Sequence, residues 1–486
     1  MGRPSVWYTV ASPVHSSFGR SMNRRDTWIL LGLVIALLTG FGVLQVGLPT
    51  GAAWTAGVTA LCAIWWVTEP VPVPVTSLVP FVVFPFTGVL THAQAAEAYG
   101  HHLILLLLGG FILSAGMERS DAHRRIAVGM VRLVGGGGKR LVLGVMLACA
   151  VCSMWISNTA TTLMLLPVVL ALMAGSDDPQ LKTPLLLGLA YSASIGGMGT
   201  PVGTPPNVVF MGVYQETTGG PGVSFVEWMG IGLPVVAVLL PLAWLWLTRH
   251  VTAETAAPVL PRPGPMTPRE RRVLILFACT AAAWVFRTQP FGGWSALIGF
   301  TTAKDSTIAL ASAVLLFIIP SGDSDPQQDR LLSWDDARGL PWGLLLLFGG
   351  GIAIAKAFGS SGLAERLGIL IAHDLGLASW PMLLTSLVIA LSVTFLTEVT
   401  SNTATTTLLM PVLAAAGLAA GIDPIVWMVP AALSASCAFM LPVATAPNAV
   451  VYGTEAVDVR TMSREGLVLN LIGAVVIAGL TTLLVG

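Results

Sequence analysis

The sequence predicts an all-α polytopic membrane protein that contains two re-entrant helical hairpins and is organised as two repeats of inverted topology. Three observations lead to this fold class. Of the 486 residues, 55% are hydrophobic and only 10% are charged, and the mean hydropathy is +0.81. Many apolar stretches are long enough to cross a bilayer. The hexapeptide Ser-Asn-Thr-Ala-Thr-Thr occurs at 157–162 and again at 401–406.

Charge and cysteine content exclude two classes of function. The 24 Lys and Arg residues balance the 24 Asp and Glu residues, so no basic surface indicates nucleic acid as a partner. The five cysteines lie in apolar stretches without the spacing of a zinc site, and we interpret them as small core residues: Cys62, Cys149, Cys152, Cys279 and Cys437.

The chain begins with a polar extension, residues 1–27, which contains Arg24 and Arg25 near its end. The apolar run 28–48 that follows is too long for the core of a signal peptide and has no small-residue cleavage site. We therefore expect it to remain as the first membrane helix, within residues 28–51.

Further apolar stretches predict the other crossings. With the first helix, eleven membrane spans are predicted, at 28–48, 52–68, 74–92, 102–118, 183–213, 226–248, 272–288, 303–320, 340–357, 424–452 and 465–485. Two additional stretches, 141–173 and 382–417, are too long for one span and carry the polar hexapeptide in their middle. These two are predicted to be hairpins that enter and leave the bilayer on the same side.

The positive-inside rule orients this arrangement. With the N-terminus in the cytoplasm, 20 of the 24 Lys and Arg residues fall in inner loops and termini; the exceptions are Arg287, Lys304, Lys356 and Arg366. We expect a multi-pass protein of the plasma (inner) membrane with its C-terminus outside. Tryptophans near span ends are typical of interfacial anchors, for example Trp228, Trp294, Trp342 and Trp380.

An internal repeat extends beyond the hexapeptide. Gly109-Gly110 matches Gly349-Gly350, Pro167-Val168 matches Pro411-Val412, Ser192-Ala193-Ser194 matches Ser434-Ala435-Ser436, and Pro206-Asn207 matches Pro447-Asn448, at offsets of 240, 244, 242 and 241. Each repeat has five crossings and one hairpin, and an odd number of crossings inverts the second copy. The predicted divisions are repeat 1 at 52–250, a cytoplasmic linker at 251–271 and repeat 2 at 272–486.

The hexapeptide places Ser and Asn, both good N-cap residues, at each predicted hairpin tip. A helix that begins there directs unpaired N–H groups and the positive end of its dipole into the membrane interior, where they favour an anion. A single Ser-Asn-Thr sequence would more often serve helix packing. Its duplication opposite a second repeated element instead indicates a binding site between the two repeats.

That second element is a helix broken near the middle of the membrane. Residues 199–207 read GTPVGTPPN and residues 441–448 read LPVATAPN. Prolines and small residues unwind the helix and expose carbonyl and threonine oxygens, which suit a monovalent cation.

Charge is almost absent from these elements, since Glu398 is the only side chain there that is charged at neutral pH. Glu398 could be a cation ligand or a structural group. A dianion that enters a site without Lys or Arg needs compensating cations, so the sequence favours bound sodium ions over anion exchange. His101-His102, at a span end, is expected to be interfacial, and the glycines of 135–138 form an inner loop that lacks a phosphate-loop motif.

The segments WISNT (155–159), EVTSNT (398–403) and CAFMLPVAT (437–445) resemble the divalent anion/sodium symporter family, from about residue 28 to the C-terminus. Members of that family are homodimers that move C4-dicarboxylates, citrate or sulfate with sodium. The resemblance implies a scaffold domain that holds the dimer and a transport domain that moves like an elevator. Ala446 departs from the pattern, because close relatives often have a second proline there.

The resemblance also implies the ligands of at least two sodium ions. The first sodium would be bound by Ser153, Ser157, Asn158 and the carbonyl of Gly203, and the second by Thr397, Ser401, Asn402 and the carbonyl of Ala444. The substrate would contact Asn158, Thr159, Thr204, Asn402, Thr403 and Thr445.

We therefore expect a sodium-coupled importer of a C4-dicarboxylate such as succinate, malate or fumarate. Two opposed sets of donors suit a molecule with a carboxylate at each end better than compact sulfate. Sodium-coupled sulfate or citrate uptake and dicarboxylate exchange are the alternatives within transport. A membrane-embedded hydrolase is disfavoured, because no His, Asp or Lys accompanies Ser157 or Ser401 in the broken elements.

Overall fold

The computed structural model of the chain describes residues 23–135, 137–174, 179–251, 264–288, 292–322, 329–370, 376 and 379–486. This part of the chain is helical throughout, and its only strand-like feature is an isolated bridge between Pro320 and Arg330. The all-α prediction is confirmed. Most of the N-terminal extension and of the linker at 251–271 lies outside the described residues.

Each predicted span is helical, and seven helices in the described ranges are long and apolar enough to cross a membrane. The spans correspond to α1 (Arg24–Gln45), α2 (Thr50–Thr68), α3 and α4 (Val73–Thr76, Val79–Thr87), α6 (His102–Arg119), α12 (Phe225–Leu247), α13 (Pro268–Val285), α15 (Asp305–Ile318), α17 (Trp342–Ser360) and α23 (Val459–Val485), besides the two broken helices below. The stretch 74–92 is not one helix, because its prolines separate α3 from α4.

Both long stretches that contain the hexapeptide fold into helix pairs. In the first, α8 (Lys139–Ser153) turns at 154–157 into α9 (Asn158–Ala174); in the second, α19 (Met382–Thr397) turns at 398–401 into α20 (Asn402–Ala419). In both pairs the second helix begins at the Asn of Ser-Asn-Thr.

Each predicted broken helix is interrupted where glycine, alanine and proline gather. The first consists of α10 (Lys182–Gly197) and α11 (Pro205–Thr218), and the second of α21 (Ile425–Ser434) and α22 (Ala446–Tyr452). Pro205 and Pro206 begin α11 because proline is tolerated in a first turn, where its missing N–H is not needed. We name the connecting segments break 1 (198–204) and break 2 (435–445).

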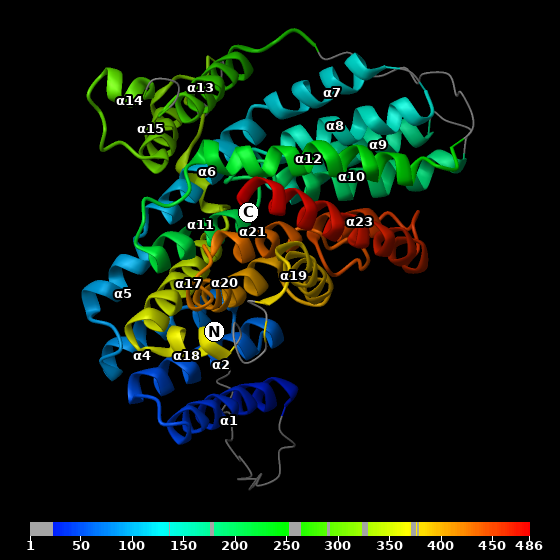
Figure 1. Cartoon of the computed structure of the whole chain (residues 1–486). Coiled ribbons are helices and arrows are strands. Elements are labelled where there is room, and N and C mark those ends of the chain that lie inside the picture. Colours follow the sequence, from blue (N-terminus) through cyan, green and yellow to red (C-terminus); the bar gives the residue numbers. More distant parts are fainter. Residues whose placement is uncertain are drawn as a thin grey trace, which may run out of the picture.

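The helix contacts of the two units correspond. Helix α10 packs on α8 and α12 in the first unit, as α21 packs on α19 and α23 in the second. Contacts of α12 with α23 and of α22 with α9 and α10 join the units. Figure 1 shows α8, α9, α10 and α12 as one group beside α19, α20, α21 and α23. The hairpins and broken helices thus form one body around the junction of the two units.

Five short helices were not predicted: α5 (His92–Tyr99), α7 (Ala122–Val134), α14 (Gly293–Leu297), α16 (Trp334–Arg338) and α18 (Leu363–Ile369). Helix α7 is strongly amphipathic and lies between α6 and the first hairpin, as α18 lies between α17 and the second. In α7, Arg125 forms an ion pair with Glu270 of α13, Nη2 to Oε2 at 3.0 Å. A search for long apolar runs misses such helices, because the charged residues of the opposite face alternate with the apolar ones along the sequence.

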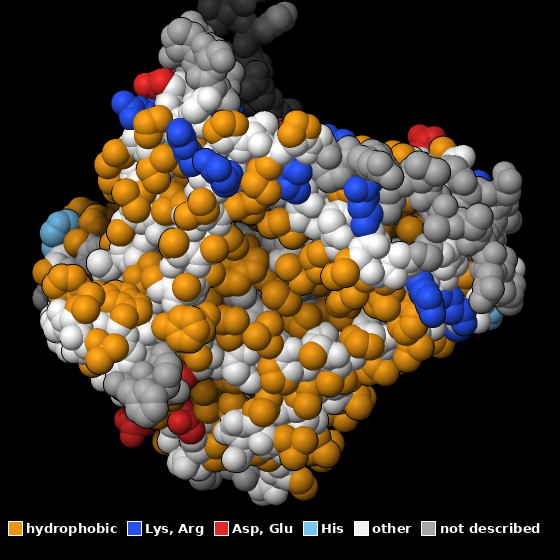
Figure 2. Space-filling view, turned by 90° about the horizontal axis from the view of Figure 1, so that it is seen from above, with side chains coloured by type: hydrophobic (Ala, Val, Ile, Leu, Met, Phe, Trp, Pro, Cys, Tyr) orange, Lys and Arg blue, Asp and Glu red, His pale blue; other side chains and the backbone are white. Residues whose placement is uncertain are grey.

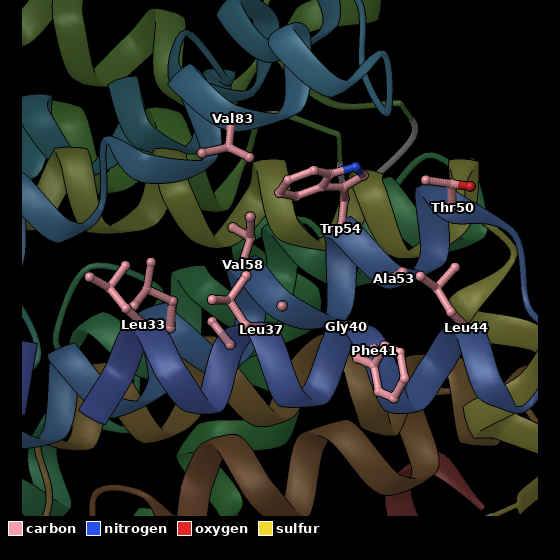
Figure 3. Close-up of a pocket in the computed structure, with 13 residues that line it drawn as sticks. Leu33, Leu37, Gly40, Phe41, Leu44, Thr50, Ala53, Trp54, Val58 and Val83 are labelled. Carbon is pink, nitrogen blue, oxygen red and sulfur yellow. The ribbon is translucent and has the colours of Figure 1, made fainter. Parts of the chain in front are cut away.

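Helices α1 and α2 pack through small residues, as membrane helices do. A Cβ added to Gly57 would lie 3.0 Å from the Ala36 carbonyl oxygen, and one added to Gly40 would lie 3.1 Å from that of Ala53. Beside this contact lies an apolar cavity lined by α1, α2 and Val83 (Figure 3). Hydrophobic side chains also cover most of the face in Figure 2, with Lys and Arg gathered along one side. Both features are typical of a surface that faces lipid.

Two expectations about individual side chains need correction. Trp228 is not an interfacial anchor: it is fully buried, and its indole N–H donates to the Met198 carbonyl oxygen at 3.0 Å. Of the five cysteines, Cys279 is exposed on α13 and is not a core residue, whereas the other four are buried.

Candidate functional site

One polar cavity of about 440 Å³ lies where the two hairpin tips meet the two breaks. The cavity receives residues from both units and from the two helices that carry the Gly-Gly pairs, α6 and α17. Its lining consists of Gly110, Phe111, Ser114, Trp155, Ser157, Asn158, Thr159, Val202, Gly203, Thr204, Pro205, Pro206, Pro341, Leu344, Ser401, Asn402, Thr403, Val443, Ala444, Thr445, Ala446 and Pro447.

The first hairpin tip gathers oxygen atoms behind the cavity wall. Ser153 is fully buried, and its hydroxyl oxygen lies 2.6 Å from Asn158 Oδ1 and 2.7 Å from the Ala193 carbonyl oxygen. The hydroxyl has one proton, so it can donate to only one of these two acceptors. Three oxygens held this closely form a suitable environment for a small cation.

The second hairpin tip repeats this arrangement. Thr397 takes the place of Ser153, and its Oγ1 lies 2.5 Å from Asn402 Oδ1 and 3.3 Å from the Ala435 carbonyl oxygen. Again one hydroxyl proton faces two acceptors. The two asparagines of the repeated hexapeptide therefore have the same kind of partner in both units.

Each break is held by one asparagine. The side chain of Asn207 donates through Nδ2 to the carbonyl oxygens of Gly197 (3.0 Å) and Thr200 (2.7 Å). Asn448 donates in the same way to those of Ala438 and Leu441, each at 3.0 Å. Both asparagines are fully buried. They fix the backbone that unwinds beside the cavity.

The backbone near the first tip is packed too closely for a side chain at Gly197. A Cβ built on Gly197 would lie 2.7 Å from Asn158 Oδ1 and 3.2 Å from the Gly203 carbonyl oxygen. These two oxygens, which sequence reasoning assigned to one sodium ion, therefore lie on the same side of Gly197.

Helix N-termini supply donors from both units. Helices α9 and α20 begin at Asn158 and Asn402, so the N–H groups of their first turns have no partner within the helix. Ser157 Oγ accepts from the Ala160 N–H at 3.2 Å. The first residues of both helices line the cavity, so the positive ends of the two helix dipoles lie beside it, an arrangement that suits an anion.

The cavity wall, where the structure describes it, contains no charged side chain. Glu398 lies behind the second tip, only 4% exposed, and its carboxylate accepts N–H groups of Met440 and Leu441 at 2.9 and 3.0 Å. A dianion in this cavity would therefore not meet a fixed positive charge at the wall.

All six residues predicted to contact substrate line this one cavity: Asn158, Thr159, Thr204, Asn402, Thr403 and Thr445. Four of the expected sodium ligands also line it, Ser157, Gly203, Ser401 and Ala444, while Ser153 and Thr397 are buried behind the tips. Their roles as ligands stay predictions.

Sequence reasoning missed two groups of residues. Asn207 and Asn448 were noted only as markers of the repeat, and their recurrence after a proline was the available signal. The contribution of α6 and α17, through Gly110, Ser114 and Leu344, was also missed, although the repeated Gly-Gly pairs lie in these two helices.

Comparison with known proteins identifies relatives along nearly the whole chain. A family model described as "Citrate transporter" matches residues 63–432. The chain is 37% identical over 472 residues to a protein of Staphylococcus saprophyticus named sodium-dependent dicarboxylate transporter SdcS, covering 92% of this chain and 89% of that one. It is also 37% identical over 471 residues to the protein of that name from Staphylococcus aureus, with the same coverage.

A solved structure shares the fold. The crystal structure of the YdaH transporter of Alcanivorax borkumensis, described as having an unusual topology, superposes with a TM-score of 0.56. The match covers 82% of this chain and 86% of that one at 15% sequence identity. A likeness at this identity concerns the fold alone.

Proposed function

The chain belongs to the citrate transporter family, in agreement with its resemblance to divalent anion/sodium symporters, and from this premise we propose that it is a sodium-coupled symporter that imports a C4-dicarboxylate such as succinate, malate or fumarate. Its curated relatives are sodium-dependent dicarboxylate transporters by name. The protein is a multi-pass membrane protein.

The observation that carries the proposal is the convergence of both Ser-Asn-Thr helix starts and both breaks on one cavity of about 440 Å³. Sites for small molecules commonly have volumes of about 300–1,000 Å³. Two sets of helix N-terminal donors come from opposite units, so each can bind one carboxylate of a short dicarboxylate. Asn158, Thr159 and Thr204 would bind one end, and Asn402, Thr403 and Thr445 the other.

Sodium ions supply the positive charge that the cavity wall lacks. The first would be bound by Ser153, Ser157, Asn158 and the Gly203 carbonyl, and the second by Thr397, Ser401, Asn402 and the Ala444 carbonyl. The close oxygen contacts of Ser153 and Thr397 support this assignment, because a cation would relieve the unsatisfied acceptors. Binding of sodium beside each tip would make dianion binding favourable and so couple the two fluxes.

The arrangement in the membrane follows from the same proposal. The N-terminus lies in the cytoplasm and the C-terminus outside, in the plasma membrane. Repeats 52–250 and 272–486 each contribute helices to a scaffold that holds a homodimer. The hairpins, the broken helices, α12 and α23 form the transport domain, which moves as an elevator. Their mutual contacts in one body support this division.

Uptake of labelled succinate into proteoliposomes tests the function. Inward gradients of sodium, potassium and protons are compared, with citrate and sulfate as competitors. We expect uptake only with the sodium gradient, inhibited by malate and fumarate more strongly than by citrate or sulfate. Uptake that ignores sodium and requires internal dicarboxylate would instead identify an exchanger, and stronger inhibition by citrate or sulfate would change the substrate.

A hydrolase is not supported by the same cavity. Ser157 and Ser401 line it, but the described wall offers no His, Asp, Glu or Lys that could act as a base for either hydroxyl. The relatives are transporters by name.

A further inference from the structure

Break 2 is anchored by a pair of side chains that the proposed site does not include. Asn470, on α23, is fully buried. Its Oδ1 accepts the Phe439 N–H at 3.2 Å, and its Nδ2 donates to Glu398 Oε1 at 2.7 Å. Glu398 accepts in turn from the next two backbone N–H groups, those of Met440 and Leu441. Three successive N–H groups of break 2 are therefore held by this pair, which we name the Asn470–Glu398 clamp.

The clamp connects three elements that meet at the proposed site. Glu398 follows Thr397 directly and lies three residues before Ser401, so it belongs to the second hairpin tip. The clamped backbone leads into Ala444 and Thr445, which line the cavity. Leu441 is fixed from its other side as well, because its carbonyl oxygen accepts from Ala444 N–H at 3.2 Å and from Asn448. Movement of α23 relative to the tip would thus displace the chain that carries Ala444.

The first unit anchors its break without a carboxylate. At an offset of 241, Phe439 corresponds to Met198, whose carbonyl oxygen accepts from the indole N–H of Trp228. Helices α12 and α23 begin at residues 225 and 459, an offset of 234, so Asn470 corresponds to Val236, which has no polar group. Glu398 corresponds to Met154 at the offset of 244 found for the hairpins. The Met154 carbonyl accepts from the hydroxyl of Thr200 in break 1. Neutral donors to carbonyls hold both breaks, since Asn448 and Ser463 donate to carbonyls of break 2 as well. Break 2 is held in addition by a carboxylate that accepts N–H groups.

This difference shows that the fold does not require a carboxylate at the tip, since the matching unit has none there. None of the ion pairs among the described residues involves Glu398. A buried carboxylate is costly at membrane depth unless it is hydrogen-bonded or near a cation. Its retention beside Thr397 and Asn402 points to a role in the second half of the site.

We propose that Asn470 is a positioning residue for the second half-site: it acts through Glu398 and the backbone of residues 439–441 to set the affinity for the sodium ion bound near Thr397 and Asn402. This inference rests on the proposed function. Charge-assisted hydrogen bonds of a buried carboxylate are strong and directional, so the clamp holds the Ala444 region in the geometry that sodium requires.

The test exchanges the two polar groups of the clamp. In Asn470→Asp, a second carboxyl oxygen replaces the amide that donates to Glu398, so the two carboxyl groups repel each other except where they share a proton. We expect the sodium concentration for half-maximal uptake to rise about tenfold or more. In Asn470→Asp with Glu398→Gln, the glutamine amide can donate to the carboxylate introduced at position 470, but the NH2 group can no longer accept the Met440 N–H. We therefore expect a partial rescue, with the sodium concentration for half-maximal uptake at least about threefold lower than in Asn470→Asp alone. A double variant no better than Asn470→Asp alone would overturn the proposal, because packing by itself predicts no rescue.

Two further variants keep the test decisive. If Asn470→Asp does not fold, Asn470→Ala removes both hydrogen bonds without repulsion; unchanged sodium half-saturation in this variant would overturn the proposal. Trp228→Phe removes a hydrogen bond that anchors break 1 in the first unit and serves as the control. We expect a rise of less than about threefold there, and a rise equal to that of Asn470→Ala would remove the distinction between the units.

The midpoint of sodium-dependent thermal stabilisation, measured on purified protein without substrate, separates this proposal from the function itself. If wild type shows no sodium-driven uptake, the proposed function fails. The clamp proposal is still tested by the midpoint: Asn470→Asp should shift it to higher sodium, and the double variant should move it back toward the wild-type value. No shift would overturn the clamp proposal.

Discussion

Lys356 of α17 forms an ion pair with Glu216 near the end of α11, with Nζ 3.5 Å from Oε1. The same ammonium group lies 2.6 Å from Glu97 of α5. Next to this pair, His102 Nε2 of α6 lies 2.9 Å from Gln215 Oε1 of α11. Helices α6 and α17 are scaffold helices in our proposal, and α11 belongs to the transport domain. Two neighbouring contacts therefore join the proposed scaffold to the proposed moving part.

Breaking the Lys356–Glu216 pair should shift the balance between transport states. Glu216→Gln removes the carboxylate that α11 contributes, and a partly buried pair of this kind stabilises by about 1 kcal/mol, equivalent to about a fivefold change in population. The readout is a cysteine introduced as Val443→Cys, at a position that is 82% exposed. We expect the rate at which an impermeant thiol reagent labels this cysteine to change about fivefold. The background carries Cys279→Ser.

The matched control for that experiment is Glu97→Gln, which removes the other partner of Lys356. Glu97 lies on α5, and its side chain is 69% exposed. Loss of the Glu97 carboxylate should leave the labelling rate within about twofold of that of the protein with Glu97, because exposed ion pairs contribute little to stability. Equal effects of the two variants would show that Lys356, and not its contact with α11, controls the rate.

Asn158→Ala and Asn402→Ala should each reduce sodium-driven uptake about a hundredfold or more while the protein stays folded. Each asparagine supplies the oxygen that faces Ser153 or Thr397, and each begins a helix whose first turn lines the cavity. Loss of an oriented oxygen in a desolvated site commonly costs about 3 kcal/mol. Initial rates of succinate uptake and gel-filtration profiles measure the two effects. Leu163→Ala, at a 53% exposed position on α9, is the control and should transport normally.

Gly197→Ala should impair the first sodium site selectively. The new methyl group would lie 2.7 Å from Asn158 Oδ1, so either the side chain or the backbone must move. Uptake should fall at least about tenfold at low sodium and recover in part at high sodium. The reciprocal control is Ala438→Gly, because residue 438 occupies the equivalent position and already carries a methyl group. Normal sodium dependence of Gly197→Ala would contradict the assignment of Asn158 and Gly203 to one ion.

Most of the fold could be predicted because its signals are local in the sequence. Long apolar runs indicate spans, and the polar hexapeptide within two of them marks the hairpin tips. The breaks lie where several prolines and small residues follow one another, because such a cluster weakens a helix more than a single proline does. Short helices such as α7 and α18 could not be recognised in this way, since they have 13 and 7 residues and charged side chains interrupt their apolar runs in the sequence.

Only those residues of the site that recur in both units could be predicted from the sequence. Both units repeat the tip asparagines and the break threonines, so the cavity wall they form was accessible from the sequence. The clamp was not, because the position of Asn470 is occupied in the first unit by Val236, which has no polar group to make a corresponding hydrogen bond. Trp228 was mistaken for a membrane anchor because it lies near a span end in the sequence, although the fold buries it completely. A departure from the repeat becomes informative only when three-dimensional contacts show what each side chain holds.

Removing sodium should destabilise the purified protein. A ligand present at about a hundred times its dissociation constant stabilises the folded state by about 2.7 kcal/mol, so sodium at two sites should raise the unfolding temperature by several degrees relative to potassium at equal ionic strength. Asn402→Ala should lose about half of this increase, because Asn158, Ser153 and the first site remain intact. Adding succinate should raise the unfolding temperature further in sodium but not in potassium. Equal unfolding temperatures of wild type in the two salts would show that the oxygen clusters at Ser153 and Thr397 do not bind sodium in this state.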